Sequence, residues 1–183
     1  LTHFSEEAMP NDNDISRCAW ANDALLIQYH DTVYGRPHKS DTALFAKFCL
    51  EGFQAGLSWR TVLAKQPAFE RAFCGFDPWR CAELSDAYLD FLMQDAGIIR
   101  NRRKIYAVRQ NAQALLWHYP APGDFRRLVY SGILPETLSR QLKQQSFCFC
   151  GPTICESFLM SVGAIEAHEP GCALFGTHAA PLP

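Results

Sequence analysis

Residues 101–119, NRRKIYAVRQNAQALLWHY, decide the fold class because they carry the longest helical pattern in the chain. Apolar side chains recur every three or four positions from Ile105 to Leu116, which is the spacing of one helix face. Pro120 would end this helix, since proline has no amide hydrogen for the next turn. Shorter stretches with the same spacing lie on both sides, and alternating strand patterns are almost absent. The sequence therefore predicts an all-α fold.

Capping residues and prolines mark where the other helices begin and end. Ser40 or Asp41 can cap the helix that follows them, because both side chains accept hydrogen bonds from the free amides of a first turn. A second helix is expected over residues 61–73, where Pro67 must kink or split it. Further helices are expected after Asp77-Pro78 and Ser85, and over residues 123–130, 135–145 and 152–164.

The 183 residues suffice for one domain with a sizeable core, which is expected to span residues 17–175. Residues 1–16 hold four acids and no lysine or arginine, so they are expected to form a disordered acidic tail, and residues 176–183 a flexible one. The first segment has neither the basic start nor the apolar run of a signal peptide. No membrane partner is expected, since no apolar run reaches the roughly 18 residues of a span.

The net charge of −2 would by itself disfavour a nucleic-acid partner. The acidic tail accounts for it, because the chain beyond residue 16 carries 17 basic and 15 acidic residues. Two basic clusters, at 100–104 and at Arg126-Arg127, could contact phosphates, although each could also be a solvated helix end. Eight cysteines without a signal peptide are typical of a reducing compartment, so a cytoplasmic location is expected.

Two cysteines and two histidines near the ends of the chain form a candidate metal site. Cys18 and His30 lie near the start, and His168 and Cys172 near the end. Two thiolates and two imidazoles are a usual tetrahedral zinc set, and a site closed by four protein ligands is structural and not catalytic. The spacing alone also allows an unrelated scatter of these residues. The other six cysteines lie in apolar contexts and are expected to pack in the core.

The segment CLEGFQAGLSW, residues 49–59, places an acid inside an apolar stretch. Buried without a partner, Glu51 would suggest a functional role, because an ionised carboxylate is costly to bury. It could instead face water at the helix end. Aromatic rings and a carboxylate could together hold a flat cationic purine by stacking and hydrogen bonding. The aromatic residues considered are Trp59, Trp20, Tyr29 and Tyr34.

Five blocks of the sequence closely resemble the 3-methyladenine DNA glycosylase I family in order and spacing. They are RCAW (17–20), YHDTVYG (29–35), CLEGFQAGLSW (49–59), QDAGIIRNRRKI (94–105) and HEPGC (168–172). The resemblance implies a helix-hairpin-helix glycosylase fold, with one structural zinc on Cys18, His30, His168 and Cys172 joining the two ends. It also implies a monomeric enzyme that removes 3-methyladenine from alkylated double-stranded DNA.

The resemblance further implies roles for particular residues. The damaged base would be flipped out of the duplex into a pocket around Glu51, the expected catalytic residue, which would bind and select the base more than activate water. Leu57 would wedge into the gap left in the duplex. Gly151 and Thr153, at the turn of the hairpin, would contact the DNA backbone through main-chain amides. The pocket would be lined by Tyr29, Trp59, Trp20, Tyr34 and Leu26.

The chain departs from the family pattern at two pocket positions, and its hairpin residues narrow the expected chemistry. Leu26 stands where the family often has tyrosine and Tyr34 where it often has tryptophan, which puts the fine shape of the pocket in doubt. No aspartate follows Gly151 and no lysine lies in the hairpin turn, which favours a monofunctional enzyme that leaves an abasic site. The acids beyond Gly151 are expected at the surface; they are Glu156, Glu166 and Glu169.

Two other classes of function compete with this interpretation. The first is a non-catalytic DNA-binding module, which would be expected to lose Glu51 or Trp59, and both are present. The second is a zinc hydrolase, which needs an open metal position, and four protein ligands leave none.

Overall fold

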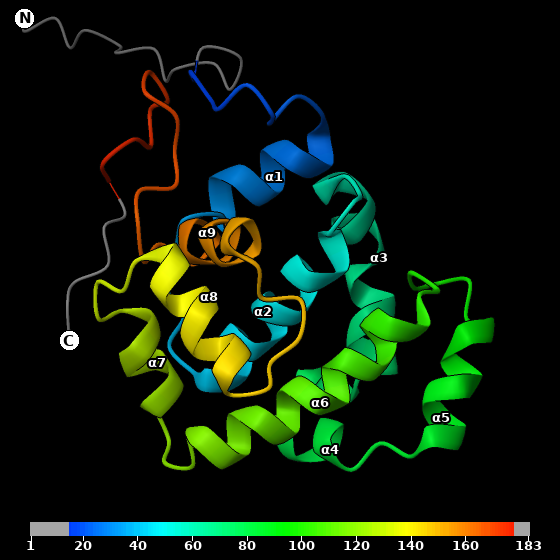
Figure 1. Ribbon diagram of the computed structural model, residues 1–183. Helices are drawn as coiled ribbons and strands as arrows, with labels where there is room; N and C mark the ends of the chain where they lie inside the picture. The colour runs from blue at the N-terminus through cyan, green and yellow to red at the C-terminus, as the bar shows by residue number, and fades with distance from the viewer. Residues whose placement is uncertain (1–14, 178–183) are drawn as a thin grey trace, which may run out of the picture.

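The computed structural model describes residues 15–177, and every regular element in that range is a helix (Figure 1). The all-α prediction is therefore confirmed. Most of the expected acidic tail, residues 1–14, and most of the expected C-terminal tail, residues 178–183, lie outside the described residues. The α-helices are α1 (Ala24–Thr32), α2 (Asp41–Gln54), α3 (Trp59–Ala72), α4 (Pro78–Ala82), α5 (Asp86–Phe91), α6 (Arg102–His118), α7 (Asp124–Val129), α8 (Pro135–Gln144) and α9 (Pro152–Ser161). Two short 3₁₀ turns accompany them, η1 (Cys74–Phe76) and η2 (Leu92–Gln94).

Helix α2 lies at the centre of the molecule, with α3, α6, α7 and α9 packed around it (Figure 1). Its expected apolar face is completely or almost completely buried, and the burial continues around the helix into the following turns. Because α2 is enclosed on several sides, it also buries two charged residues, Lys47 and Glu51. The expected buried face consists of Leu44, Phe45, Phe48 and Cys49.

The caps at the start of α2 have two different tasks. Ser40 caps α2 itself, since its side chain accepts from the amide of Ala43. Asp41 instead accepts hydrogen bonds from the amides of Gly123 at 2.6 Å and Arg126 at 2.8 Å, so it caps α7. A carboxylate at a helix start is favourable because it satisfies free amides and complements the helix dipole. Asp41 thus links the start of α2 to a helix more than 80 residues away.

Two expected helices differ from the structure. Pro67 does not split the helix around it, because α3 continues as one element from Trp59 to Ala72. The missing amide costs one hydrogen bond, and the burial of Val62 and Phe69 on the same helix offsets it. The helix expected between Ser85 and Gly97 is shorter, because α5 gives way to the 3₁₀ turn η2.

Helix α6 holds two loops in place through buried polar side chains. Lys104, in its first turn, donates to the carbonyl oxygens of Phe53 at 2.8 Å and Ala55 at 2.6 Å, at the end of α2. Asn111 makes two hydrogen bonds with the backbone of Cys148, in the connection between α8 and α9. A positive charge is favourable at a helix C-terminus, and a buried amide needs partners for both of its groups. Both loops are therefore fixed to one rigid helix.

Candidate functional site

A cavity of about 480 Å³ opens where α1, α2, α3 and α9 meet the segment that follows α9. The rim includes Arg60, which pairs with Asp23 at the start of α1. A volume of this size matches the range of pockets that bind small molecules. All six residues expected to form the base pocket line it, namely Trp20, Leu26, Tyr29, Tyr34, Glu51 and Trp59. Seven further residues line it that the sequence did not indicate: Gln54, Ser58, Arg60, Ser157, Met160, Ala167 and Glu169.

Glu51 does not face water at a helix end, because it lies inside the cavity wall with only 3% of its surface exposed. Nor is it unpaired. Lys47, one turn earlier on α2, places its ammonium 3.1 Å from Glu51 Oε1 and is itself 5% exposed. Burial lowers the pKa of Lys47 to about 8, against the opposing effect of the Glu51 charge. Sequence reasoning missed this lysine.

Four aromatic rings enclose the cavity beside Glu51. The ring centroids of Tyr29 and Trp59 lie 5.3 Å apart, those of Trp20 and Tyr34 lie 4.9 Å apart, and those of Tyr29 and Tyr34 lie 5.8 Å apart. Burial raises the pKa of the Tyr29 phenol well above its usual range, so the phenol is neutral. The indole Nε1–H of Trp59 is buried and has no acceptor among residues 15–177. A buried donor of this kind is costly unless a ligand accepts from it.

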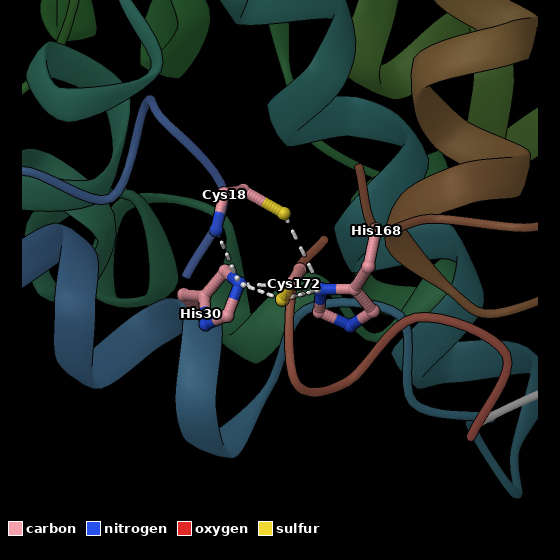
Figure 2. Close-up of side chains that lie close together, drawn as sticks. All are labelled: Cys18, His30, His168 and Cys172. Atoms are coloured by element: carbon pink, nitrogen blue, oxygen red, sulfur yellow. Dashed lines mark hydrogen bonds between the residues drawn. The ribbon is translucent and has the colours of Figure 1, made fainter. Parts of the chain in front are cut away.

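The four expected metal ligands lie together, although about 140 residues separate the two halves of the set (Figure 2). All four are buried, and their ligand atoms lie within 4.8 Å of one another. His30 Nδ1 lies 2.8 Å from Oδ1 of Asp31, which leaves Nε2 to face the cluster. A carboxylate that holds the outer nitrogen of a histidine is the usual second partner at a metal site.

Four of the six separations between ligand atoms fit a tetrahedral ion. Zinc holds sulfur at about 2.3 Å and nitrogen at about 2.0 Å, so neighbouring ligand atoms lie about 3.3–3.8 Å apart. Cys18 Sγ lies 3.6 Å from His168 Nδ1, and Cys172 Sγ lies 3.4 Å from His30 Nε2 and 3.7 Å from His168 Nδ1. The two histidine nitrogens are 3.2 Å apart. Both the donor types and their spacing therefore suit zinc.

The cluster and the cavity share a wall. The Trp20 ring lies 5.3 Å from the His30 ring, and the Tyr34 ring lies 5.3 Å from the His168 ring, both edge to face. Glu169, next to His168, lines the cavity and accepts a hydrogen bond from the amide of Ala19 at 2.7 Å. The segment after α9 therefore both completes the cluster and closes one side of the cavity.

Gly35 allows this close approach. Its φ of +71° lies in the left-handed region, and a Cβ there would meet Ala167 Cβ at 2.9 Å and His168 Nε2 at 3.0 Å. Any larger residue would therefore push His168 away from the cluster.

The other expected DNA contacts lie on two exposed turns. Leu57 is 43% exposed at the turn between α2 and α3, where Gly56 adopts a φ of +78°. Gly151 and Thr153 lie at the start of α9, which no side chain among the described residues caps. The first amides of such a helix remain available to an anion.

The two basic clusters differ in their surroundings. Arg100 and Arg103 are exposed at the start of α6, where positive charge opposes the helix dipole. Their neighbour Lys104 contacts the carbonyl of Ala55, so this cluster lies beside the turn that carries Leu57. The pair Arg126-Arg127 lies on α7, which follows the opposite end of α6. The three acids expected at the surface, Glu156, Glu166 and Glu169, are exposed.

Among residues 15–177 the protein is all-helical, and a cavity with a buried carboxylate among aromatic rings is suited to binding a flat ring compound. The comparison with known families identifies it further. The methyladenine glycosylase family matches over residues 19–175, and the chain belongs to that family.

Individual relatives agree along almost their whole length. The chain is 37% identical to DNA-3-methyladenine glycosylase 1 of Escherichia coli, over 88% of this chain and 97% of that protein. It is 34% identical to DNA-3-methyladenine glycosylase of Haemophilus influenzae, over 86% of this chain and 96% of that protein. Two solved structures of 3-methyladenine DNA glycosylase I superimpose with TM-scores of 0.80 and 0.78. The first is 36% identical and covers 86% of this chain and 98% of its own; the second, from Staphylococcus aureus, is 32% identical and covers 86% and 95%.

Proposed function

We propose that this protein removes 3-methyladenine from alkylated duplex DNA by hydrolysing the N-glycosidic bond. The observation that carries the proposal is the cavity itself, where a buried carboxylate and an unsatisfied indole N–H lie between aromatic rings. The relatives named above are DNA-3-methyladenine glycosylases, and the S. aureus structure concerns recognition of 3-methyladenine. The chemistry of the cavity and the activity of the named relatives therefore favour the same substrate, 3-methyladenine.

The cavity residues have complementary roles toward the base. Tyr29 and Trp59 hold its flat ring by stacking, which is worth about 1–3 kcal/mol for each base–aromatic contact. Glu51 accepts a hydrogen bond from the exocyclic amine. Leu26 and Tyr34 set the outline of the cavity, so they influence which purines fit.

Methylation at N3 leaves the adenine positively charged in DNA, so its glycosidic bond is already weak and the base departs neutral. The protein therefore has to flip, bind and select the base more than activate water. No lysine lines the cavity among the described residues, so an attack by an amine on the sugar has no candidate there. The expected product is an abasic site from a monofunctional enzyme.

The exposed turns hold the duplex while the base is in the cavity. Leu57 fills the space that the flipped nucleotide leaves, since an apolar wedge replaces lost stacking. Helices α8 and α9 with their connection act as the helix-hairpin-helix, in which amides near Gly151 and Thr153 bind a backbone phosphate. Lys104 and Asn111 attach both turns to α6, which keeps wedge and phosphate site at a fixed separation.

Zinc is the metal that the cluster of Cys18, His30, His168 and Cys172 would bind. The donor set and its spacing support this choice, and four protein ligands make the site structural. The bound ion would connect the segment before α1 to the segment after α9. Its binding energy then contributes to folding at both ends.

The cysteines bear on where in the cell the protein acts. All eight cysteines are unpaired in the structure, which favours a reducing compartment such as the cytoplasm. No helix among residues 15–177 is long and apolar enough to cross a membrane. We expect the protein to act on duplex DNA as a monomer.

Chromatography of the bases released from methylated DNA tests the proposed function. We expect 3-methyladenine to appear in the supernatant in proportion to enzyme, with the DNA backbone intact until alkali cleaves the abasic sites. Tight binding to methylated DNA without base release would contradict the proposal and favour a damage sensor.

The basic cluster at the start of α6 gives a second prediction. Replacing Arg100 and Arg103 with alanine is expected to weaken binding to undamaged duplex DNA and to reduce the slope of log K against log salt by about 1 for each lost phosphate contact. Titration at several salt concentrations measures this slope. The matched control is R126A/R127A on α7, which follows the far end of α6, roughly 25 Å from its start. An equal effect of both double variants would mean that binding is not localised beside Leu57.

A further inference from the structure

Arg60 is the one lysine or arginine among the described residues that line the cavity. It lies in the first turn of α3, three residues after Leu57, and 61% of its side chain is exposed. A positive charge in the first turn of a helix opposes the helix dipole. The charge of Arg60 therefore does not contribute to the stability of α3.

In the free protein the partner of Arg60 is Asp23, the residue before α1. The guanidinium Nε donates to Oδ2 of Asp23, while Oδ1 of the same carboxylate accepts from the amide of Leu26 at 3.0 Å and so caps α1. The hydrogen bond from the Leu26 amide and then that from Arg60 lower the pKa of Asp23, so this carboxylate is charged at neutral pH. The ion pair therefore joins the N-terminal ends of α1 and α3 at the edge of the cavity.

This ion pair leaves most of the guanidinium unused. An exposed ion pair contributes little to stability, because water competes for both partners. A guanidinium carries five N–H donors in a planar fork, and within residues 15–177 only the Nε of Arg60 has an acceptor. A second anion that reaches the mouth of the cavity can therefore bind Arg60, and it competes there with Asp23.

The proposed function brings such an anion to this place. A nucleotide whose base is flipped into the cavity remains attached to its backbone, so the phosphates beside it arrive at the mouth. Leu57, the proposed wedge, lies on the turn directly before α3, which places the flipped nucleotide next to the first turn of that helix. The other charged residues of the lining, Glu51 and Glu169, are acids that repel a phosphate. Arg60 is therefore the residue of the lining that attracts one.

We propose that Arg60 holds a backbone phosphate beside the flipped nucleotide, and that Asp23 competes with this phosphate for the guanidinium. The inference rests on the proposed function, because the phosphate reaches the mouth only when a nucleotide occupies the cavity. Arg60 binds the backbone and not the base. It therefore strengthens the hold on flipped DNA without a part in the choice of base.

Single-turnover release of 3-methyladenine from methylated duplex DNA tests this role. With enzyme in excess, it gives the maximal rate and the enzyme concentration at half-maximal rate. For Arg60→Gln we expect the half-maximal concentration to rise about tenfold or more at low salt, since a hydrogen bond to a charged group is worth at least that factor. The maximal rate should stay close to that of the unaltered protein, because the contact is already made before the bond breaks.

The dependence on salt gives a second measure of the same contact. In R60Q the slope of the logarithm of the half-maximal concentration against log salt should fall by about 1, the value for one lost phosphate contact. Arg60→Lys keeps the charge, and we expect it to restore most of this slope.

Asp23→Asn distinguishes a phosphate contact from a structural ion pair. Asparagine keeps a side-chain oxygen that caps α1, but it removes the negative charge beside Arg60. We expect the half-maximal concentration to fall about threefold or more, opposite in sign to R60Q, because a competing charge next to the phosphate is gone. Shifts in the same direction in D23N and R60Q would overturn the proposal, since an ion pair that only holds α1 against α3 is lost in both.

Two controls complete the experiment. Calorimetric titration with free 3-methyladenine, which has no phosphate, should give the same dissociation constant for R60Q, D23N and the unaltered protein. The matched control is Arg71→Gln, which removes an exposed arginine at the other end of α3, roughly 16 Å from Arg60, and should leave the half-maximal concentration unchanged.

The outcomes distinguish the two proposals. An unchanged half-maximal concentration and salt slope in R60Q, with the base still released, would overturn the role of Arg60 alone. Absence of base release by the unaltered protein would overturn the proposed function and this inference with it.

Discussion

Replacing Glu51 with glutamine is expected to lower the rate of 3-methyladenine release about 100-fold or more, while the protein stays folded. Removing one preorganised hydrogen-bonding group that touches the reacting molecule typically costs a factor of about 10²–10³ in rate. Glu51 lines the cavity and is buried, so water cannot take over its task. Glutamine keeps an oxygen for the Lys47 ammonium, which maintains the packing of α2. Single-turnover excision with enzyme in excess measures the rate, and circular dichroism checks the fold.

The choice of glutamine follows from the buried pair. Alanine would leave Lys47 without its partner, which typically costs about 3–5 kcal/mol of stability and would confuse loss of chemistry with loss of fold. The matched control is Glu156→Gln, since Glu156 is an exposed acid on α9 that does not line the cavity. That variant should release the base within about twofold of the unaltered rate. Normal release by E51Q would mean that Glu51 is not the residue that selects the base.

The ion-pair partner of Glu51 could have been predicted from the sequence. Lys47 precedes Glu51 by four residues, and side chains four apart lie on the same face of a helix. The sequence reasoning considered the immediate apolar neighbours of Glu51, which occupy other faces, and left its partner open. The burial of both charges could not be read locally, because it depends on how α2 is enclosed by α3 and α9.

The residues that form the C-terminal wall of the cavity could not be predicted from local sequence patterns. Ser157, Met160 and Ala167 carry no motif, and they reach the site only because α9 and the segment after it dock there. The cluster of Cys18 and His30 with His168 and Cys172 likewise depends on tertiary contacts across the chain. Its spacing left an accidental scatter open, and the family resemblance supported the grouping because it matched both ends together.

Pro67 illustrates a different limit. A proline inside a helical pattern indicates a break, since it removes a hydrogen bond and crowds the preceding turn. Helix α3 nevertheless continues through Pro67, while Phe69 beyond it is completely buried. Local sequence patterns indicate that a proline destabilises a helix, but they do not show how much the burial of other residues on the same helix offsets this cost.

Substitution of Cys172 by serine is expected to remove the metal and to lower the free energy of unfolding by about 4–5 kcal/mol. Loss of a metal site is among the few single changes with effects of this size. For a chain of this length, such a loss corresponds to a fall in the melting temperature of about 10–15 °C. Elemental analysis of the purified protein should find one zinc per chain before the substitution and almost none after it. Thermal unfolding with and without a chelator measures the stability.

The effect should reach the cavity as well, because the cluster supports one of its walls. Trp20 and Tyr34 pack edge to face on His30 and His168, so loss of the ion removes the support behind two of the four rings. C172S should therefore bind 3-methyladenine more weakly even at temperatures where it is folded. The matched control is Cys148→Ser, whose half-buried thiol lies outside the cluster, and which should keep its zinc, stability and base binding. A purified protein that holds no metal and loses no stability on C172S would mean that the four residues pack together without an ion.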